Sequence, residues 1–228
     1  MKKEKAVVLL SGGLDSSVVL SIAIKNGFIP YCVSFDYGQR HKKELFYAKK
    51  QVFLQKVKFY KVFKIDFFGG SALTDNIEIP NNRYSSNIPN DIPVTYVPAR
   101  NTIFLSYALG YSEYLQCRNI FIGVNIIDYS GYPDCRPEFI SMFEKMANIA
   151  TKQSVLGQKI KIHTPLLKMN KKEIIETGEK NNVDFKYTMS CYNPKNKINC
   201  GECDACLLRL NGFFEANIKD PTKYKKNV

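Results

Sequence analysis

A short polar loop, residues 11–17 with the sequence SGGLDSS, separates two apolar segments near the start of the chain. Gly12 and Gly13 allow backbone N–H groups to approach an anion, and the flanking serines add hydroxyl donors at the positive end of an expected helix. The loop lacks the lysine of most phosphate-binding loops, and Asp15 would repel a bare polyphosphate unless it held Mg²⁺ or a bridging water. The pattern therefore predicts a phosphate site served by Mg²⁺; a Gly-Gly turn with Ser and Asp helix caps is the alternative.

Four of the seven cysteines gather late in the chain as C-x8-C-x2-C-x2-C: Cys191, Cys200, Cys203 and Cys206. Each C-x2-C turn brings two thiolates within reach of one tetrahedral ion, so the spacing predicts a closed, structural Zn²⁺ site. A redox pair and an iron–sulfur cluster are the alternatives, although the bacterial ferredoxin run continues with x3-C-P and this one does not. Disulfides are disfavoured because we expect no export signal. Cys32 and Cys117 lie in apolar patterns and are expected to be buried.

The segments that must position these residues alternate between short apolar runs and stretches of helical periodicity. We expect strands at 6–10, 29–35, 59–65, 119–124 and 160–163, and helices at 15–26, 43–57, 101–115, 138–153, 171–181 and 205–214. Such alternation predicts an α/β fold with an open, mostly parallel sheet and helices on both faces. The loop at 11–17 then lies at the carboxyl end of the first strand, where such sheets bind ligands.

The composition narrows the classes of function. The 228 residues are 45% hydrophobic and 24% charged, and no apolar run reaches the roughly 18 residues that a membrane span needs. We therefore expect a cytoplasmic protein without membrane contact. The net charge of +12 comes mostly from lysines, with six arginines among 33 basic residues, and it predicts a solvated surface more than a nucleic-acid partner. The irregular stretch at 67–98 is typical of a functional lid.

Three motifs and the cysteine cluster together carry a family resemblance. SGGLDS after an apolar strand resembles the PP-loop of the ATP pyrophosphatase superfamily, whose members split ATP between its α and β phosphates. VPARN at 97–101 and GVNIIDYSGYPDCRPEF at 123–139 narrow the resemblance to the 7-cyano-7-deazaguanine synthases of the queuosine pathway. Residues 67–95 show no matching motif. The resemblance implies a PP-loop ATP-binding α/β domain over 1–185 and a four-cysteine zinc-binding segment over 186–228.

This resemblance implies an ATP-dependent ligase that joins ammonia to 7-carboxy-7-deazaguanine. The nitrile 7-cyano-7-deazaguanine forms through an adenylated acid and an adenylated amide, with release of AMP and pyrophosphate. The resemblance also implies ATP with Mg²⁺, structural Zn²⁺ and a homodimer, with small molecules and not nucleic acid as partners. The alternatives are a PP-loop tRNA-modifying enzyme that adenylates and then thiolates or aminates a base, and a non-enzymatic zinc module that binds nucleic acid.

The resemblance assigns roles to individual residues as well. Nucleotide binding falls on the stretch Leu10, Ser11, Gly12, Gly13, Leu14, Asp15, Ser16, Ser17, Val18, Val19 and Leu20. The candidate catalytic residues are Asp15, Arg100 and Asp128. Arg100 suits phosphate or carboxylate because a guanidinium binds either in a bidentate manner, and a surface salt bridge is its alternative. The candidate substrate-binding residues are Asp128, Tyr129, Asp134 and Arg136, with Tyr129 or Tyr132 stacking on the base.

Four residues near these motifs leave two interpretations open. Asn101 is expected to cap the helix that it begins or to contact the ligand. Lys168 and Lys171 are candidates for a phosphate contact, with a solvated side chain the simpler expectation for each. His41, after the second strand, is a candidate neighbour of the nucleotide. Adenylation needs no histidine nucleophile, because the substrate carboxylate attacks.

Overall fold

The centre of the protein is a five-stranded sheet of order β3-β2-β1-β4-β5, in which every neighbouring pair is parallel. The structure, a computed structural model, describes residues 3–40, 42–66, 69–81, 92–127, 131–194 and 198–225. The strands are β1 Lys5–Leu9, β2 Ile29–Asp36, β3 Phe59–Lys64, β4 Asn119–Phe121 and β5 Lys161–His163. The predicted parallel α/β fold is confirmed.

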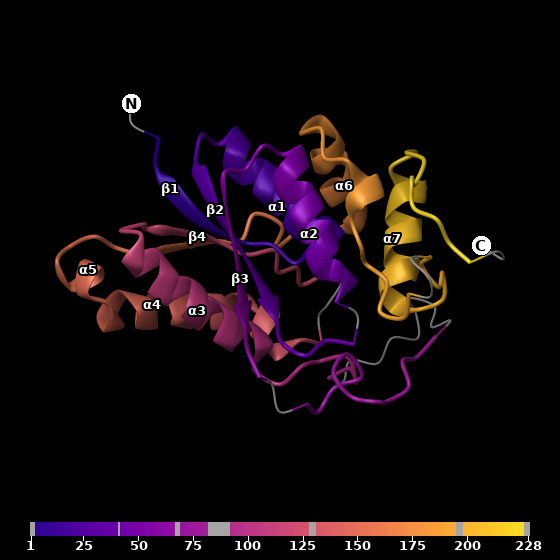
Figure 1. Cartoon of the computed structure of the whole chain (residues 1–228), viewed down its shortest axis with the longest axis horizontal. Coiled ribbons are helices and arrows are strands. Elements are labelled where there is room, and N and C mark those ends of the chain that lie inside the picture. The colour runs from indigo at the N-terminus through magenta and orange to yellow at the C-terminus, as the bar shows by residue number, and fades with distance from the viewer. Residues whose placement is uncertain are drawn as a thin grey trace.

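Helices cover both faces of this sheet. The α-helices are α1 Leu14–Lys25, α2 Lys43–Leu54, α3 Arg100–Tyr114, α4 Pro137–Ala150, α5 Lys152–Val155, α6 Lys171–Lys180 and α7 Asp204–Glu215, and the short 3₁₀ turns are η2 Pro133–Cys135 and η3 Phe185–Tyr187. Figure 1 shows α1, α2, α6 and α7 on one side of the sheet and α3 and α4 on the other. Two apolar cores, one on each side, match this arrangement.

The central strand β1 explains why the sequence there is continuously apolar. Val7 and Leu9 belong to the core under α3 and α4, whereas Ala6 and Val8 belong to the core under α1 and α6. Alternate side chains of a strand point to opposite faces, and both faces of β1 are covered. Burial on both faces therefore explains the continuous apolar run of β1.

The strand order places a crevice at the carboxyl end of β1. The chain runs outward from β1 through β2 to β3 and then returns to add β4 and β5 on the other side of β1. Ligands of open α/β sheets bind where this direction reverses. The loop that contains Gly12 connects β1 to α1 at this point. The predicted position of the loop is therefore confirmed.

Three predicted elements have bounds that differ by more than one residue, and one of them, the helix expected at 43–57, ends at Leu54. The helix expected at 138–153 is interrupted at Thr151, which is extended (φ −111°, ψ 141°) and whose hydroxyl donates to the Ala147 carbonyl at 2.9 Å. The strand expected at 119–124 ends at Phe121. Beyond it the chain approaches the start of α1, where a Cβ on Gly123 would lie 3.4 Å from the Ser16 nitrogen. After Ile122, whose N–H still donates to the His163 carbonyl at 3.0 Å, close approach to α1 replaces strand pairing.

A buried arginine joins the last helix to the rest of the protein. Arg209 on α7 is 1% exposed, and its Nε lies 2.9 Å from an oxygen of Asp220. Its other nitrogens donate to the Thr188 hydroxyl at 2.7 Å and to the Phe185 carbonyl at 3.1 Å. Every contact satisfies part of the guanidinium, which makes the burial of this charge tolerable. The division of the chain at residue 185 stays a prediction.

We expect Arg209→Ala to lower the free energy of unfolding by about 3 kcal/mol, because it leaves the buried carboxylate of Asp220 without its partner. Although burial acts to raise it, hydrogen bonds and the charge of Arg209 hold the pKa of Asp220 below its usual value. The pair therefore stabilises the fold above the unfolded pKa of Asp, about 3.9, and this stabilisation is lost as the pH falls through the lower folded value. Urea unfolding at pH 7 and pH 3 measures both effects; an equal loss at both pH values would contradict them.

Candidate active site and metal centre

The loop after β1 is pressed against the start of α2. Gly12 has a left-handed φ of +87°, and a Cβ there would lie 2.3 Å from the Glu44 carbonyl oxygen and 2.5 Å from the Ala48 nitrogen. Neither the conformation nor the space accepts a larger residue. The Gly12 carbonyl also accepts a hydrogen bond from the Met189 N–H at 2.9 Å. Gly12 therefore fixes the loop between α2 and the late segment of the chain.

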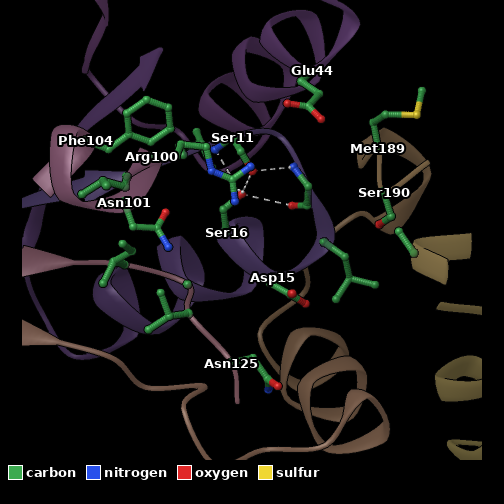
Figure 2. A pocket seen from close by; sticks show the side chains of 18 of the residues that line it. Ser11, Asp15, Ser16, Glu44, Arg100, Asn101, Phe104, Asn125, Met189 and Ser190 are labelled. Carbon is green, nitrogen blue, oxygen red and sulfur yellow. Dashed lines mark hydrogen bonds between the residues drawn. The ribbon is translucent and has the colours of Figure 1, made fainter. Parts of the chain in front are cut away.

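The loop serines form a hydrogen-bonded group at the first turn of α1. The hydroxyls of Ser11 and Ser16 lie 3.0 Å apart, and the hydroxyl of Ser16 donates to the Gly13 carbonyl at 3.2 Å (Figure 2). Gly13 is the N-cap residue and offers no side chain to the N–H groups of this turn. Those N–H groups and the serine hydroxyls therefore face a ligand position at the positive end of the helix. The alternative in which Ser or Asp caps this helix is wrong.

Asp15 forms an ion pair with a lysine from the other half of the chain. The Lys171 Nζ lies 2.8 Å and 3.0 Å from the two carboxylate oxygens of Asp15. The lysine side chain is 9% exposed, so the expectation that Lys171 is solvated was wrong, whereas Lys168 is exposed as expected. Asn170 and Glu173 form a capping box that begins α6 at Lys171. The ammonium that the loop itself lacks is thus supplied by α6.

Arg100, Tyr37 and Glu44 line the same cavity of about 230 Å³ as the loop. Burial raises the pKa of Glu44 to about 7, against the opposing charge of Arg100, and it raises the pKa of Tyr37 to about 12. Burial acts to lower the pKa of Arg100, but Tyr37 and Tyr132 hold it above its usual value. The cavity therefore contains a permanent cation and a carboxyl group that titrates near neutral pH. Arg100 is half-buried in the wall of this cavity.

The start of α3 is held by the segment around Asp134. Ala99 precedes the helix in the left-handed region (φ 52°, ψ 23°), which is strained for a residue with a Cβ. The carboxylate of Asp134 accepts the Asn101 N–H at 2.9 Å, and the Asn101 amide donates to the Cys135 sulfur at 3.3 Å. These bonds hold the strained turn in place and direct the Arg100 side chain into the cavity.

The four late cysteines form one cluster. Their sulfurs all lie within 4.8 Å of one another, and the Cys200 sulfur is 3.5 Å from that of Cys191 and 3.8 Å from that of Cys206. Zn–S bonds of about 2.3 Å in a tetrahedron separate the sulfurs by roughly 3.8 Å. Backbone N–H groups donate to the sulfurs of Cys191, Cys200 and Cys203, which favours thiolates. The donor set therefore fits a tetrahedral metal ion.

The metal cluster also forms part of the cavity wall. Ser190 and Tyr192, on either side of the ligand Cys191, both line the cavity, and so does Ala205 beside Cys206. The Tyr192 N–H donates to the Cys203 sulfur at 3.4 Å. An ion held by the four sulfurs would thus fix the backbone that carries this wall.

Comparison with known proteins places the chain in a family. Residues 5–217 match the family model described as "Queuosine biosynthesis protein QueC". The protein belongs to this QueC family. It is 54% identical over 227 residues to a 7-cyano-7-deazaguanine synthase from Citrifermentans bemidjiense, and this match covers 98% of this chain and 99% of the relative. It is also 53% identical over 225 residues to a 7-cyano-7-deazaguanine synthase from Rickettsia akari, and this match covers 97% of this chain and 99% of the relative.

A solved structure is also similar to this QueC family chain. NMN synthetase from Francisella tularensis is 15% identical, with a TM-score of 0.47, over 95% of this chain and 78% of that one.

Only some of the residues proposed for nucleotide binding in this QueC family member line the cavity. Those from the nucleotide-binding stretch that line the cavity are Leu10, Ser11, Gly13, Leu14, Asp15 and Ser16. The others, Gly12, Ser17, Val18, Val19 and Leu20, do not: Gly12 faces α2, and the last four are 0% exposed. The apolar face of α1 buries Val18, Val19 and Leu20 in the core.

The proposed substrate-binding residues do not lie together in the cavity. Asp134 does not line the cavity, because its carboxylate is used at the start of α3. Arg136 is exposed at the N-cap of α4, away from the cavity. Asp128 and Tyr129 lie outside the described residues, as does His41. Of the other candidates in this QueC family member, Asn101 and Tyr132 line the cavity.

Sequence reasoning missed several residues of the cavity. Tyr37 and Glu44 follow the carboxyl end of β2, next to β1 in the sheet. Phe104 on α3 stacks on Phe35 with a centroid distance of 4.0 Å, and Cys135 closes the wall beside Asn101. The available signal was the strand end itself, because neighbouring parallel strands end at one edge of the sheet.

Proposed function

We propose that the protein converts 7-carboxy-7-deazaguanine, ammonia and ATP to 7-cyano-7-deazaguanine, with release of AMP and pyrophosphate. The observation that carries this proposal is the cavity at the end of β1, which combines a helix N-terminus, the pair of Asp15 with Lys171, and Arg100. These groups suit polyphosphate and a carboxylate, and relatives that match almost the whole chain are named for this product.

The chemistry explains why such a cavity is needed. A carboxylate on an electron-rich ring is a poor electrophile, and its oxygen is a poor leaving group. Attack of the acid on the α-phosphate of ATP forms an acyl adenylate and pyrophosphate, and ammonia then displaces AMP to form the amide. A second adenylation, at the amide oxygen, allows loss of AMP to the nitrile. Each round needs the departing pyrophosphate to be held.

The residues at the loop suit that task. The first N–H groups of α1 and the hydroxyls of Ser11 and Ser16 would bind the pyrophosphate. The pair of Asp15 and Lys171 offers an oxygen ligand for the Mg²⁺ that accompanies ATP and an ammonium for its phosphates. Mg²⁺ would neutralise the charge that develops on the departing pyrophosphate.

The other wall suits the acyl group and the rings. Arg100 would bind the substrate carboxylate or the α-phosphate as a bidentate donor. The aromatic rings of Phe104 and Tyr132 line the cavity beside it and offer flat surfaces to a deazaguanine or adenine ring. We also propose Zn²⁺ as the ion of the cysteine cluster, where it would hold Tyr192 in place.

Mass-spectrometric detection of the nitrile tests the proposed function. We expect the purified protein with ATP, Mg²⁺, the acid and ammonium to form the nitrile with two molecules of AMP for each. Omission of ammonium should stop the reaction at the adenylated acid. Formation of AMP that depends on tRNA and ignores the acid would contradict the proposal and favour a tRNA-modifying enzyme.

The proposed homodimer has its best support in an apolar surface on α4 and α5. Ile149 is 79% exposed, Val155 73% and Leu156 71%, and Met142 on the same helix as Ile149 is 61% exposed. Such a surface is typical of an interface, and a second copy of the chain could cover it. A sedimentation coefficient that stays that of a monomer at all protein concentrations would contradict a dimer.

No helix in the described ranges is long and apolar enough to cross a membrane. We propose the cytoplasm as the location, where small-molecule substrates and not nucleic acid are the partners. We also keep the division into an ATP-binding domain over 1–185 and a zinc-binding segment over 186–228 as a proposal. Limited proteolysis that releases a stable fragment ending near residue 185 would support this division.

A further inference from the structure

The proposed reaction must remove every hydrogen from the attacking nitrogen. Ammonia brings three hydrogens, and the nitrile nitrogen keeps none. One proton leaves when ammonia displaces AMP and the amide forms, a second when the amide oxygen attacks ATP, and a third when AMP is lost to the nitrile. The departure of AMP and pyrophosphate does not by itself take up these protons. A base near the reacting carbon would therefore serve all three steps.

Few of the described groups around the cavity can act as this base. Arg100 and Lys171 are cations, and the carboxylate of Asp15 is engaged by Lys171 at 2.8 Å. Burial raises the pKa of Tyr37 to about 12 and that of Cys135 to about 12, so both keep their protons at neutral pH. His163 does not line the cavity. Glu44 is the carboxylate that is left among the described lining residues.

The position of Glu44 is fixed relative to the loop. It lies in the first turn of α2, and its own carbonyl oxygen is the atom that excludes a Cβ from Gly12. Figure 2 shows its carboxylate pointing from α2 toward the loop that carries Ser11. The side chain therefore lines the cavity next to the loop that we propose holds the pyrophosphate.

The charges around Glu44 suit a group that gains and loses protons. Arg100 and Tyr37 face it, and Asp15, Lys171 and Arg209 lie around the same cavity. Burial raises its pKa to about 7, while Arg100 acts in the opposite direction. A base of this strength is ionised often enough to accept a proton and weak enough to pass it to water.

We infer that Glu44 is the general base that accepts the nitrogen-bound protons in amide and nitrile formation, an inference that rests on the proposed function. When the C–N bond forms and the C–O bond to AMP breaks, a nitrogen-bound proton moves to the Glu44 carboxylate and from there to solvent. The same carboxylate accepts the amide proton in the second adenylation and the last N–H proton as AMP leaves. The first adenylation needs no base, because the acid is already ionised.

The variant Glu44→Gln separates these steps because it keeps the size of the side chain and removes the base. Acid-dependent exchange of pyrophosphate into ATP, measured without ammonium, reports the first adenylation, and we expect it within about threefold of the wild type. Amide and nitrile formation should fall on the order of 10²-fold. With free ammonia held constant, the wild-type rate should rise with pH through about 7, and this rise should be absent from the variant.

Glu138→Gln is the matched control, because Glu138 lies in the first turn of α4, is exposed and is not part of the cavity. Wild-type amination rates in Glu44→Gln would overturn the inference. An equal loss of exchange and amination would also overturn it, since Glu44 would then act on nucleotide binding or on folding. If the wild type itself shows no acid-dependent exchange, the proposed function fails, and the inference fails with it.

Discussion

Replacing Asp15 with alanine is expected to lower acid-dependent AMP release by about 10²- to 10³-fold, the range that follows loss of one charge-stabilising group in an active site. Two effects contribute. The variant lacks the oxygen ligand that we propose for Mg²⁺. It also removes the carboxylate that lies 2.8 Å from the ammonium of Lys171, a side chain that is 9% exposed. Quantifying AMP by chromatography measures the loss.

The same variant should lose about 1–3 kcal/mol of unfolding free energy, because the mostly buried ammonium of Lys171 loses its ion pair with the Asp15 carboxylate. Combining Asp15→Ala with Lys171→Met should recover most of this stability without recovering activity, since it removes the charge that the Asp15 carboxylate had balanced and does not restore the lost oxygen ligand. Asp36→Ala is the matched control: Asp36 pairs with Lys42, whose side chain is 63% exposed, and such surface pairs contribute little. Retained AMP release in Asp15→Ala would show that the proposed metal role is wrong.

The position of the loop could be predicted from the sequence, whereas the lysine that pairs with its Asp15 could not. The apolar run before Ser11 and the helical pattern after it are local features, and a parallel sheet then forces the loop to the ligand edge. Lys171 reaches Asp15 across 156 residues of sequence. Its type and spacing are those of any solvated lysine at a helix start. Only the packing of α6 beside α1 decides its partner, and periodicity does not encode that packing.

Asp134 shows how a correct signal can receive the wrong role. Its polar loop does lie on the ligand side of the sheet, as predicted, since its neighbours Tyr132 and Cys135 line the cavity. The carboxylate itself accepts the Asn101 N–H. A helix N-terminus has free N–H groups that any nearby carboxylate can satisfy, and the helix and the ligand compete for the same group. Sequence alone does not say which one wins.

Replacing Cys203 with serine is expected to remove the metal and to destabilise the protein by more than about 4 kcal/mol, because the binding energy of a structural ion is part of the folding energy. Cys203 is 0% exposed, and its sulfur accepts the Tyr192 N–H. Elemental analysis and thermal unfolding measure the two losses. A chelator should destabilise the wild type and leave the metal-free variant unchanged.

Cys117→Ser is the matched control, because it changes a buried cysteine without removing a ligand of the ion. Its sulfur donates to the Lys5 carbonyl at 3.1 Å, far along the chain from the metal cluster, and a serine hydroxyl can make the same bond. This control should retain the metal and lose about 1 kcal/mol. Because Ser190 and Tyr192 border the cavity on either side of Cys191, Cys203→Ser should also raise KM for its substrates at temperatures where it remains folded. A stable, metal-replete Cys203→Ser variant with unchanged KM would contradict both the four-sulfur site and its position in the cavity wall.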